Sequence, residues 1–131
     1  MLTYDEVWST FLDNYKVNPR DLPQDNPTIY QDIRNAVMQF NNRLRTEAQC
    51  DDVTETITGV DTNDDRLLIA QYIKLAYLIN SKTLYETLYQ PMTADVGLRN
   101  YRTQVTSLET SIKRQEETIE KIIFNSREDF L

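Results

Sequence analysis

The sequence predicts an all-α protein, a bundle of about four helices that ends in a long antiparallel helical hairpin. The first observation is the scarcity of turn-forming residues, with only two Gly and four Pro among 131 residues. A chain so poor in turn formers has few turns and favours long helices. The second is helical spacing of apolar residues in four stretches, which are separated by a Pro-punctuated connection at residues 17–27, by the segment 46–63 and by Pro91. At this length we expect one domain, residues 1–131.

The first two helices have recognisable start signals. Thr3 and Glu6 form a capping box, which predicts a helix over residues 4–16. Asn26 followed by Pro27 places a side-chain cap before a proline at the first helical position, which predicts a helix over residues 27–45. Its apolar positions lie on one face: Ile29, Ile33, Ala36, Val37, Phe40 and Leu44.

The segment 46–63 is acidic and has no helical period. Residues 47–65 contain seven acids and no Lys or Arg, which matches the net charge of −7. The stretch VTETIT alternates and is rich in β-branched residues, as in a short strand or extended arm. Because burying unpaired carboxylates is costly, we expect a solvated arm, mobile in the isolated subunit and ordered by assembly. Its acids are Glu47, Asp51, Asp52, Glu55 and Asp61.

The third helix is predicted to be the central core helix. From Leu67 to Ile79, 11 of 13 residues are apolar, which is typical of a helix buried on nearly all sides. The run is too short to span a membrane and includes Lys74. We expect a helix from about 64 to 90 whose Leu68, Leu75 and Ile79 pack against the second helix.

The last helix, expected from about 95 to 126, has an apolar stripe with heptad steps. Its first half should pack on the third helix, since two long helices joined by a short turn lie antiparallel. Gln115 interrupts the stripe, and its surroundings on both sides are strongly charged, with Glu109–Lys113 and Glu117–Lys121 four residues apart. We hypothesise that this distal part contacts another subunit, and that glutamate at 119 and 122 blocks assembly without unfolding the monomer. The proposed contact residues are Ile112, Gln115, Ile119, Ile122 and Phe124.

The residue inventory argues against catalysis and metal binding. There is no His to act as a general base near neutral pH, and Cys50 has no His partner. The DTNDD stretch fails as a calcium loop because positions six and twelve hold Arg66 and Tyr72. We therefore expect no enzyme and no cofactor. The absence of a basic patch argues against tight, non-specific DNA binding.

The lone Cys50 fits a reducing compartment, or a virion assembled in one, and the N-terminus lacks the pattern of a signal peptide. Neither observation indicates membrane insertion or export.

Two stretches together resemble the small head–tail connector (adaptor) proteins of tailed bacteriophages. NPTIYQDIRNAVMQFNNRLR is an amphipathic helix that ends in a polar turn, and DDRLLIAQYIKLAYLINSKTLYETLYQP is a long apolar helix led by acids. A variable polar loop lies between them and a long helix follows. The similarity covers residues 26–126 and consists of helix order, length and apolar pattern. The first helix has no clear counterpart.

The resemblance implies a structural virion protein of the neck. Such proteins form a ring, usually twelve-fold, between the portal protein and the tail or stopper protein. The ring continues the DNA channel, so DNA passes nearby without sequence-specific binding. It also implies localisation in the virion neck, with host cytoplasm as the place of assembly. The acidic arm would then face the DNA channel or an adjoining ring.

An alternative of another class remains open. A cytoplasmic helical regulatory or antitoxin-like protein, dimeric through its last helix, has the same helical pattern and the same lack of catalytic motifs. The mass of the free protein, and its behaviour with a portal ring, would separate the two.

Overall fold

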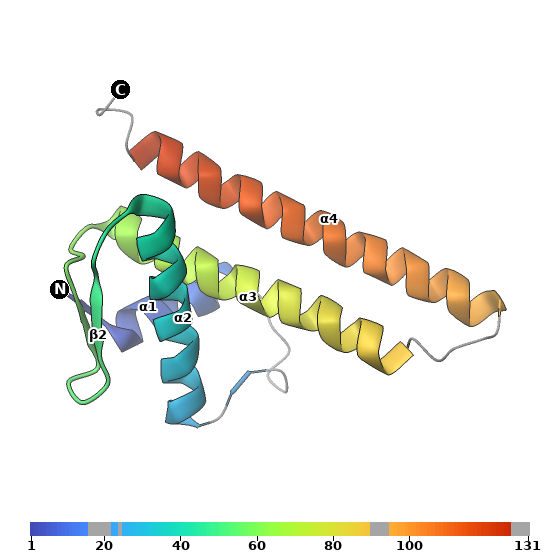
Figure 1. Cartoon of the computed structure of the whole chain (residues 1–131), viewed down its shortest axis with the longest axis horizontal. Helices are drawn as coiled ribbons and strands as arrows, with labels where there is room; N and C mark the ends of the chain where they lie inside the picture. The colour runs from blue at the N-terminus through green and yellow to red at the C-terminus, as the bar shows by residue number, and fades with distance from the viewer. Residues whose placement is uncertain (16–21, 24, 90–94, 127–131) are drawn as a thin grey trace.

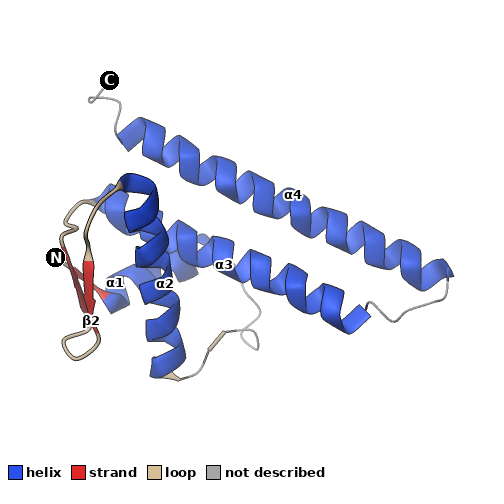
Figure 2. Ribbon diagram, in the orientation of Figure 1, coloured by secondary structure: helices blue, strands red, loops and turns tan. Residues whose placement is uncertain are grey.

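The computed structural model of the chain describes residues 1–15, 22–23, 25–89 and 95–126. It is mostly helical, which confirms the predicted fold class, and it adds a small three-stranded sheet (Figures 1 and 2). The helices are α1 (Tyr4–Asn14), α2 (Asn26–Leu44), α3 (Asn63–Tyr89) and α4 (Asp95–Ser126). The strands are β1 (Leu2–Thr3), β2 (Gln49–Asp51) and β3 (Thr56–Thr58).

The helix α3 is the centre of the fold, as predicted. It contacts α1, α2 and α4, and its N-terminal half is buried among them. The sheet, α1 and α2 form a compact head around that half, while the far ends of α3 and α4 extend away from it as an antiparallel pair (Figure 1). The head therefore holds one continuous core, and the extending pair has only its two helices to bury apolar surface.

The helix ends follow their caps. The Thr3 hydroxyl accepts a hydrogen bond from the Glu6 amide at 3.1 Å, as the capping box predicts. α1 ends at Asn14, and the expected final residue of that helix, at 16, lies outside the described residues. The cap of α2 is Asp25, one residue earlier than predicted, because its carboxylate accepts from the Thr28 amide.

The acidic segment is folded, which corrects the expectation of a mobile arm. β2 and β3 form an antiparallel hairpin, and β3 also pairs with β1, so the strand order is β1-β3-β2. The alternation in VTETIT places Ile57 in the core with no exposure, between the less buried Thr56 and Thr58. The chain's own N-terminus thus provides the pairing that we had assigned to a partner.

The core includes most of the predicted contacts, with one exception. Ile33, Val37 and Phe40 are buried together with Leu68 in one cluster. Leu75 is only partly buried, and Ile79 is 44% exposed. The prediction that Ile79 belongs to this core is therefore wrong, because α2 covers only the N-terminal half of α3.

A buried pair of glutamines joins α3 to α4. Gln71 and Gln115 are the buried polar residues among those described. The Gln115 side-chain amide donates to the Gln71 backbone carbonyl at 3.0 Å and to its side-chain oxygen at 2.5 Å. Each residue is a polar break in an apolar stretch of its helix, and these two breaks face each other. Any other register would bury at least one amide without a partner.

We predict that Gln115→Ala lowers the free energy of unfolding by about 1–3 kcal/mol, because it leaves the Gln71 amide buried without its partner. Replacing both glutamines by leucine should recover much of the loss, since both desolvated groups are then removed. Chemical denaturation of the three proteins checks this. Equal losses in the single and double variants would contradict the pairing.

Candidate interaction groove

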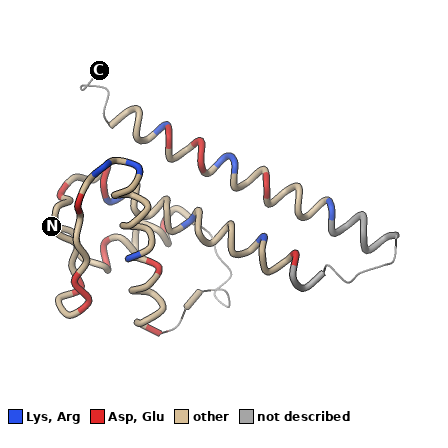
Figure 3. The backbone as a smooth tube through the Cα atoms, viewed as in Figure 1, with Lys and Arg blue, Asp and Glu red and all other residues tan. Residues whose placement is uncertain are grey.

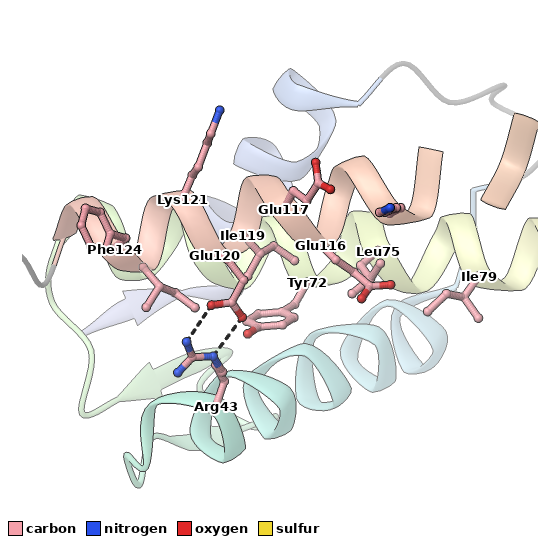
Figure 4. A pocket seen from close by; sticks show the side chains of 12 residues that line it. Arg43, Tyr72, Leu75, Ile79, Glu116, Glu117, Ile119, Glu120, Lys121 and Phe124 are labelled. Atoms are coloured by element: carbon pink, nitrogen blue, oxygen red, sulfur yellow. Dashed lines mark hydrogen bonds and ion pairs between the residues drawn. The ribbon is translucent and has the colours of Figure 1, made fainter. Parts of the chain in front are cut away.

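A groove of about 1200 Å³ lies between α2, α3 and α4 (Figure 4). Its floor is apolar and comes from Tyr72, Leu75 and Ile79 of α3. Its wall on α4 includes Ile119 and Ile123. The charged residues around it are Arg43, Lys113, Glu116, Glu117, Glu120 and Lys121. An apolar floor with a charged rim is the composition of a protein-binding groove.

The groove exists because α2 crosses α3 instead of covering its whole length. Arg43, near the end of α2, lies beside Tyr72, and Asp32, near its beginning, accepts from the Tyr77 hydroxyl, so α3 is less covered beyond Tyr77. α3 has apolar residues on nearly all sides in this region, so an uncovered turn exposes apolar surface. Ile79 is exposed for this reason, and Phe124, in the last turns of α4, is 61% exposed at the edge of the groove.

An ion pair links the end of α2 to α4 across the groove. The Arg43 guanidinium donates to both carboxylate oxygens of Glu120, at 3.0 and 2.6 Å (Figure 4). This bond lowers the pKa of Glu120, and the same carboxylate raises the pKa of Arg43. The Arg43–Glu120 pair therefore helps to hold α2 and α4 at a fixed distance across the groove. Burial raises the pKa of Tyr72, another groove residue.

This ion pair should make a small, pH-dependent contribution to stability. The pKa of Glu120 is lower in the folded chain than its ordinary value of 4.5. The contribution is therefore complete above that pH and is lost as the pH falls through the lowered pKa. At pH 7 we expect Glu120→Gln to cost no more than about 1 kcal/mol, since both side chains are half exposed.

Thermal unfolding from pH 7 down to pH 3 measures the difference between the native chain and Glu120→Gln. Glu116→Gln, at an exposed position on the same rim, is the control. The curves of the native chain and Glu120→Gln should converge at the acidic end. A gap that stays constant over the whole range would contradict the role of the charge.

The five contact residues predicted on the last helix do not form one surface. Gln115 is 4% exposed and bonded to Gln71, and Ile119 is 2% exposed in the core cluster. Ile122 is partly buried against the same cluster, and Ile112 is half-buried. Of these five residues, only Phe124 is largely exposed and can contact a partner. The expectation that residues 119 and 122 can both be changed without unfolding the monomer is therefore wrong, since Ile119 is a core residue.

The acids of residues 46–63 mostly bond within the chain. Asp51 accepts from the Val53 amide at 2.9 Å and so closes the hairpin turn. Asp52 accepts from the Tyr4 hydroxyl at 2.6 Å and from the Arg34 guanidinium. Glu55 and Asp61 also accept bonds, from the Tyr30 hydroxyl and the Met1 ammonium group. The fifth residue, Glu47, is exposed.

The hydrogen bonds to Asp52 and Glu55 raise the pKa values of the two tyrosines that donate them. The hydrogen bond to Glu55 raises the pKa of Tyr30 to about 12. Burial, followed by the bond to Asp52, raises the pKa of Tyr4. Both hydroxyls remain protonated donors at neutral pH, so the two carboxylates hold the hairpin against α1 and α2. The predicted docking arm is therefore also part of the head's own structure.

Other kinds of site find little support in the described part of the chain. The described residues contain no group of three His, Cys, Asp or Glu side chains placed to hold a metal ion. Within the same residues, no helix has the length and apolar content needed to cross a bilayer. Burial raises the pKa of the Cys50 thiol, which lowers its reactivity. Among the described residues, the groove is therefore the candidate binding site.

Sequence reasoning missed most of the groove. Arg43, Tyr72 and Ile79 were assigned to a helix end and to the core. No local signal marks the site, because the second helix is longer than the apolar run from 67 to 79, and the exposure of Ile79 depends on how the two helices cross.

The fold is that of a small, mostly helical protein with an apolar groove between α2, α3 and α4. A family model described as the YomZ prophage protein matches residues 1–128, and the chain belongs to this family. It is 43% identical over 131 residues, 100% of both chains, to the SPbeta prophage-derived uncharacterized protein YomZ of Bacillus subtilis (strain 168). No solved structure matches. The resemblance to phage proteins is confirmed at the level of prophage origin.

Proposed function

We propose that the chain is a structural protein of the phage particle, a head–tail connector subunit that forms a ring between portal and tail. The observation that carries the proposal is the apolar groove at Tyr72, Leu75 and Ile79, which the chain's own described elements leave open. A ring subunit needs a lateral surface of this kind on a stable monomeric core. The prophage family supports a role in the particle or its assembly.

The order of elements supports the same proposal. The amphipathic helix, the polar loop, the long apolar helix and the final long helix of the resemblance correspond to α2, the β2–β3 hairpin, α3 and α4. The function is mechanical and not enzymatic. The subunit would contact its own copies, the portal protein and the tail or stopper protein.

The charge of the chain is compatible with a DNA channel. The net charge is −7, and acidic and basic residues are interspersed along α4 (Figure 3). A surface without a concentrated basic patch does not retain a moving polyanion. DNA would therefore pass the ring without sequence-specific binding, in the neck of a particle assembled in the host cytoplasm.

Electron microscopy of the purified protein with portal rings of its phage tests the proposal. We expect an added ring on the portal's tail-side face. Phe124→Glu and Ile79→Glu should prevent the addition while both variants remain folded. Met38→Glu is the matched control, because Met38 is 65% exposed on α2 and does not line the groove.

Portal rings that stay unchanged at high concentrations of folded protein would contradict the connector role and favour the regulatory class. A ring that forms equally well with Phe124→Glu and Ile79→Glu would contradict the role of the groove.

A further inference from the structure

The ends of α3 and α4 that extend from the head form an arm with little buried surface (Figure 1). We define the arm by residues 78–86 and 102–112, the part of the extending pair whose side chains the structure describes. Within these residues, Leu78 is the one buried side chain, at 8% exposure. It lies outside the cluster that forms the core of the head. The contacts that hold the arm are therefore separate from those that hold the head.

The two helices of the arm meet along a seam that is only partly apolar. On α4 the half-buried aliphatic residues have helical spacing: Val105, Leu108 and Ile112. On α3 the described half-buried residues beyond Leu78 are mostly polar: Lys82, Tyr85 and Glu86. The aliphatic residues Ile79 and Leu84 are 44% and 59% exposed. Because tertiary stability comes mainly from buried apolar area, the arm gains much less of it than the head.

The ion pairs of the arm add little to this seam. The Lys82 ammonium group lies 3.3 Å from Glu109 on the facing helix and 3.4 Å from Glu86 on its own helix. All three side chains are in contact with solvent. Ion pairs of this kind contribute little to stability, because solvent and salt screen them.

We propose that the arm opens and closes as a cooperative unit of its own while the head remains folded. Residues 78–89 are the last twelve of α3, and isolated helices shorter than about 12–15 residues are marginal in water unless another element packs on them. Here the packing element is α4, whose half-buried aliphatic residues are covered by α3 in return. Each helix depends on the other, so loss of their contact releases both.

Two contacts set the limit of the opening on the side of the head. The buried Gln71–Gln115 bond joins α3 to α4, and breaking it would leave buried amides without partners. The Tyr77 hydroxyl donates to Asp32 of α2 at 3.2 Å and holds α3 to the head one residue before Leu78. The boundary of the arm therefore lies after Tyr77 on α3 and before Gln115 on α4.

The arm includes one end of the groove. Ile79 lines the groove and lies in the arm, so the open form lacks that end of the binding surface. A partner that covers Ile79 binds the closed form better and shifts the population toward it. The inference goes beyond the proposed function and does not rest on it, because the arm opens in the free protein.

Native-state hydrogen exchange of the purified protein in low concentrations of urea measures the opening. We expect amides of the arm, such as that of Leu84, to have opening constants at least about tenfold larger than those of Ile69 and Ile73 in the head part of the same helix. All amides of the arm should share one opening constant. Their exchange should depend less on urea, because opening of the arm exposes less surface than global unfolding.

Substitutions of leucine by alanine on α3 separate the arm from the head. Leu68 is fully buried in the head's cluster, and its contacts remain when the arm opens. Leu68→Ala should accelerate exchange of the head amides at least about tenfold and leave the arm amides unchanged within about twofold.

Leu78→Ala should accelerate exchange of all arm amides together, at least about tenfold, because the closed arm then loses its buried leucine. Leu84→Ala is the matched control. This leucine is mostly exposed on the same arm, and its loss should change exchange by less than about threefold. Circular dichroism would verify that each variant is folded.

Three results would overturn the inference: arm amides that exchange as slowly as those of the head, an arm that Leu68→Ala accelerates as much as the head, or arm amides that respond one by one to Leu78→Ala. The first is measured on the native chain and needs no variant. None of them involves a portal ring, so failure here is distinct from failure of the connector role.

Discussion

Ile119→Glu should unfold the head, whereas the same change at Phe124, five residues further along α4, should leave it folded. Ile119 is 2% exposed and packs in the core cluster, so a carboxylate there would be desolvated without a partner. We expect a loss of more than about 4 kcal/mol, a large fraction of the stability of a domain of this size. Phe124 is mostly exposed, and its substitution should change stability by no more than about 0.5 kcal/mol.

Thermal and urea unfolding followed by circular dichroism would measure both variants, with Ile119→Ala as a milder probe expected to cost about 2–5 kcal/mol. A folded Ile119→Glu protein that only fails to assemble would support the original hypothesis that Ile119 contacts another subunit. It would also contradict the packing of α4 on the head.

Removing the carboxylate of Asp52 should destabilise the head, although this residue lies in an exposed hairpin turn. Asp52 is the acceptor for the Tyr4 hydroxyl and for Arg34. Asp52→Ala leaves the hydroxyl of the buried Tyr4 without its carboxylate acceptor, and we expect a loss of about 1–3 kcal/mol. Tyr4→Phe removes the donor instead and should be milder, because no buried polar group is then left unpaired.

The control is Glu47→Ala, an acid of the same segment at an exposed position, which should be nearly neutral. Native-state amide exchange gives a second readout. The Tyr4 amide donates to the Glu55 carbonyl at 2.9 Å and should be protected in the free protein. Fast exchange of this amide, together with an Asp52→Ala protein as stable as the native chain, would contradict the folded hairpin and support a mobile arm over residues 46–63.

Local signals in the sequence predicted the helices well. The capping box at Thr3 and the proline at position 27 placed two helix starts within a residue of those observed. The apolar run from 67 to 79 identified the central helix, because a helix without a polar side has to be surrounded. These features depend on neighbours within a few residues, which is the range over which propensity and spacing are informative.

The features that the sequence did not predict all depend on contacts between residues that are distant in sequence. Leu2 pairs with Ile57, and no local pattern marks a two-residue strand at the N-terminus as the partner of a hairpin. The partners of Asp52 and Gln115 lie 18 to 48 residues away. Without them the acids looked unpaired and the glutamine looked like a break in a weak seam. The groove was missed because its position depends on how α2 crosses α3 and α4 in space.

Cryo-electron microscopy of the neck of particles from the phage that encodes this chain is the most direct test of the connector role. The account predicts a ring directly below the portal in which each subunit fits the α1–α2 head and the antiparallel α3–α4 pair, with the groove at Ile79 and Phe124 covered by a neighbouring chain. A neck whose density is fully accounted for by other proteins, in particles that lack this chain, would contradict it.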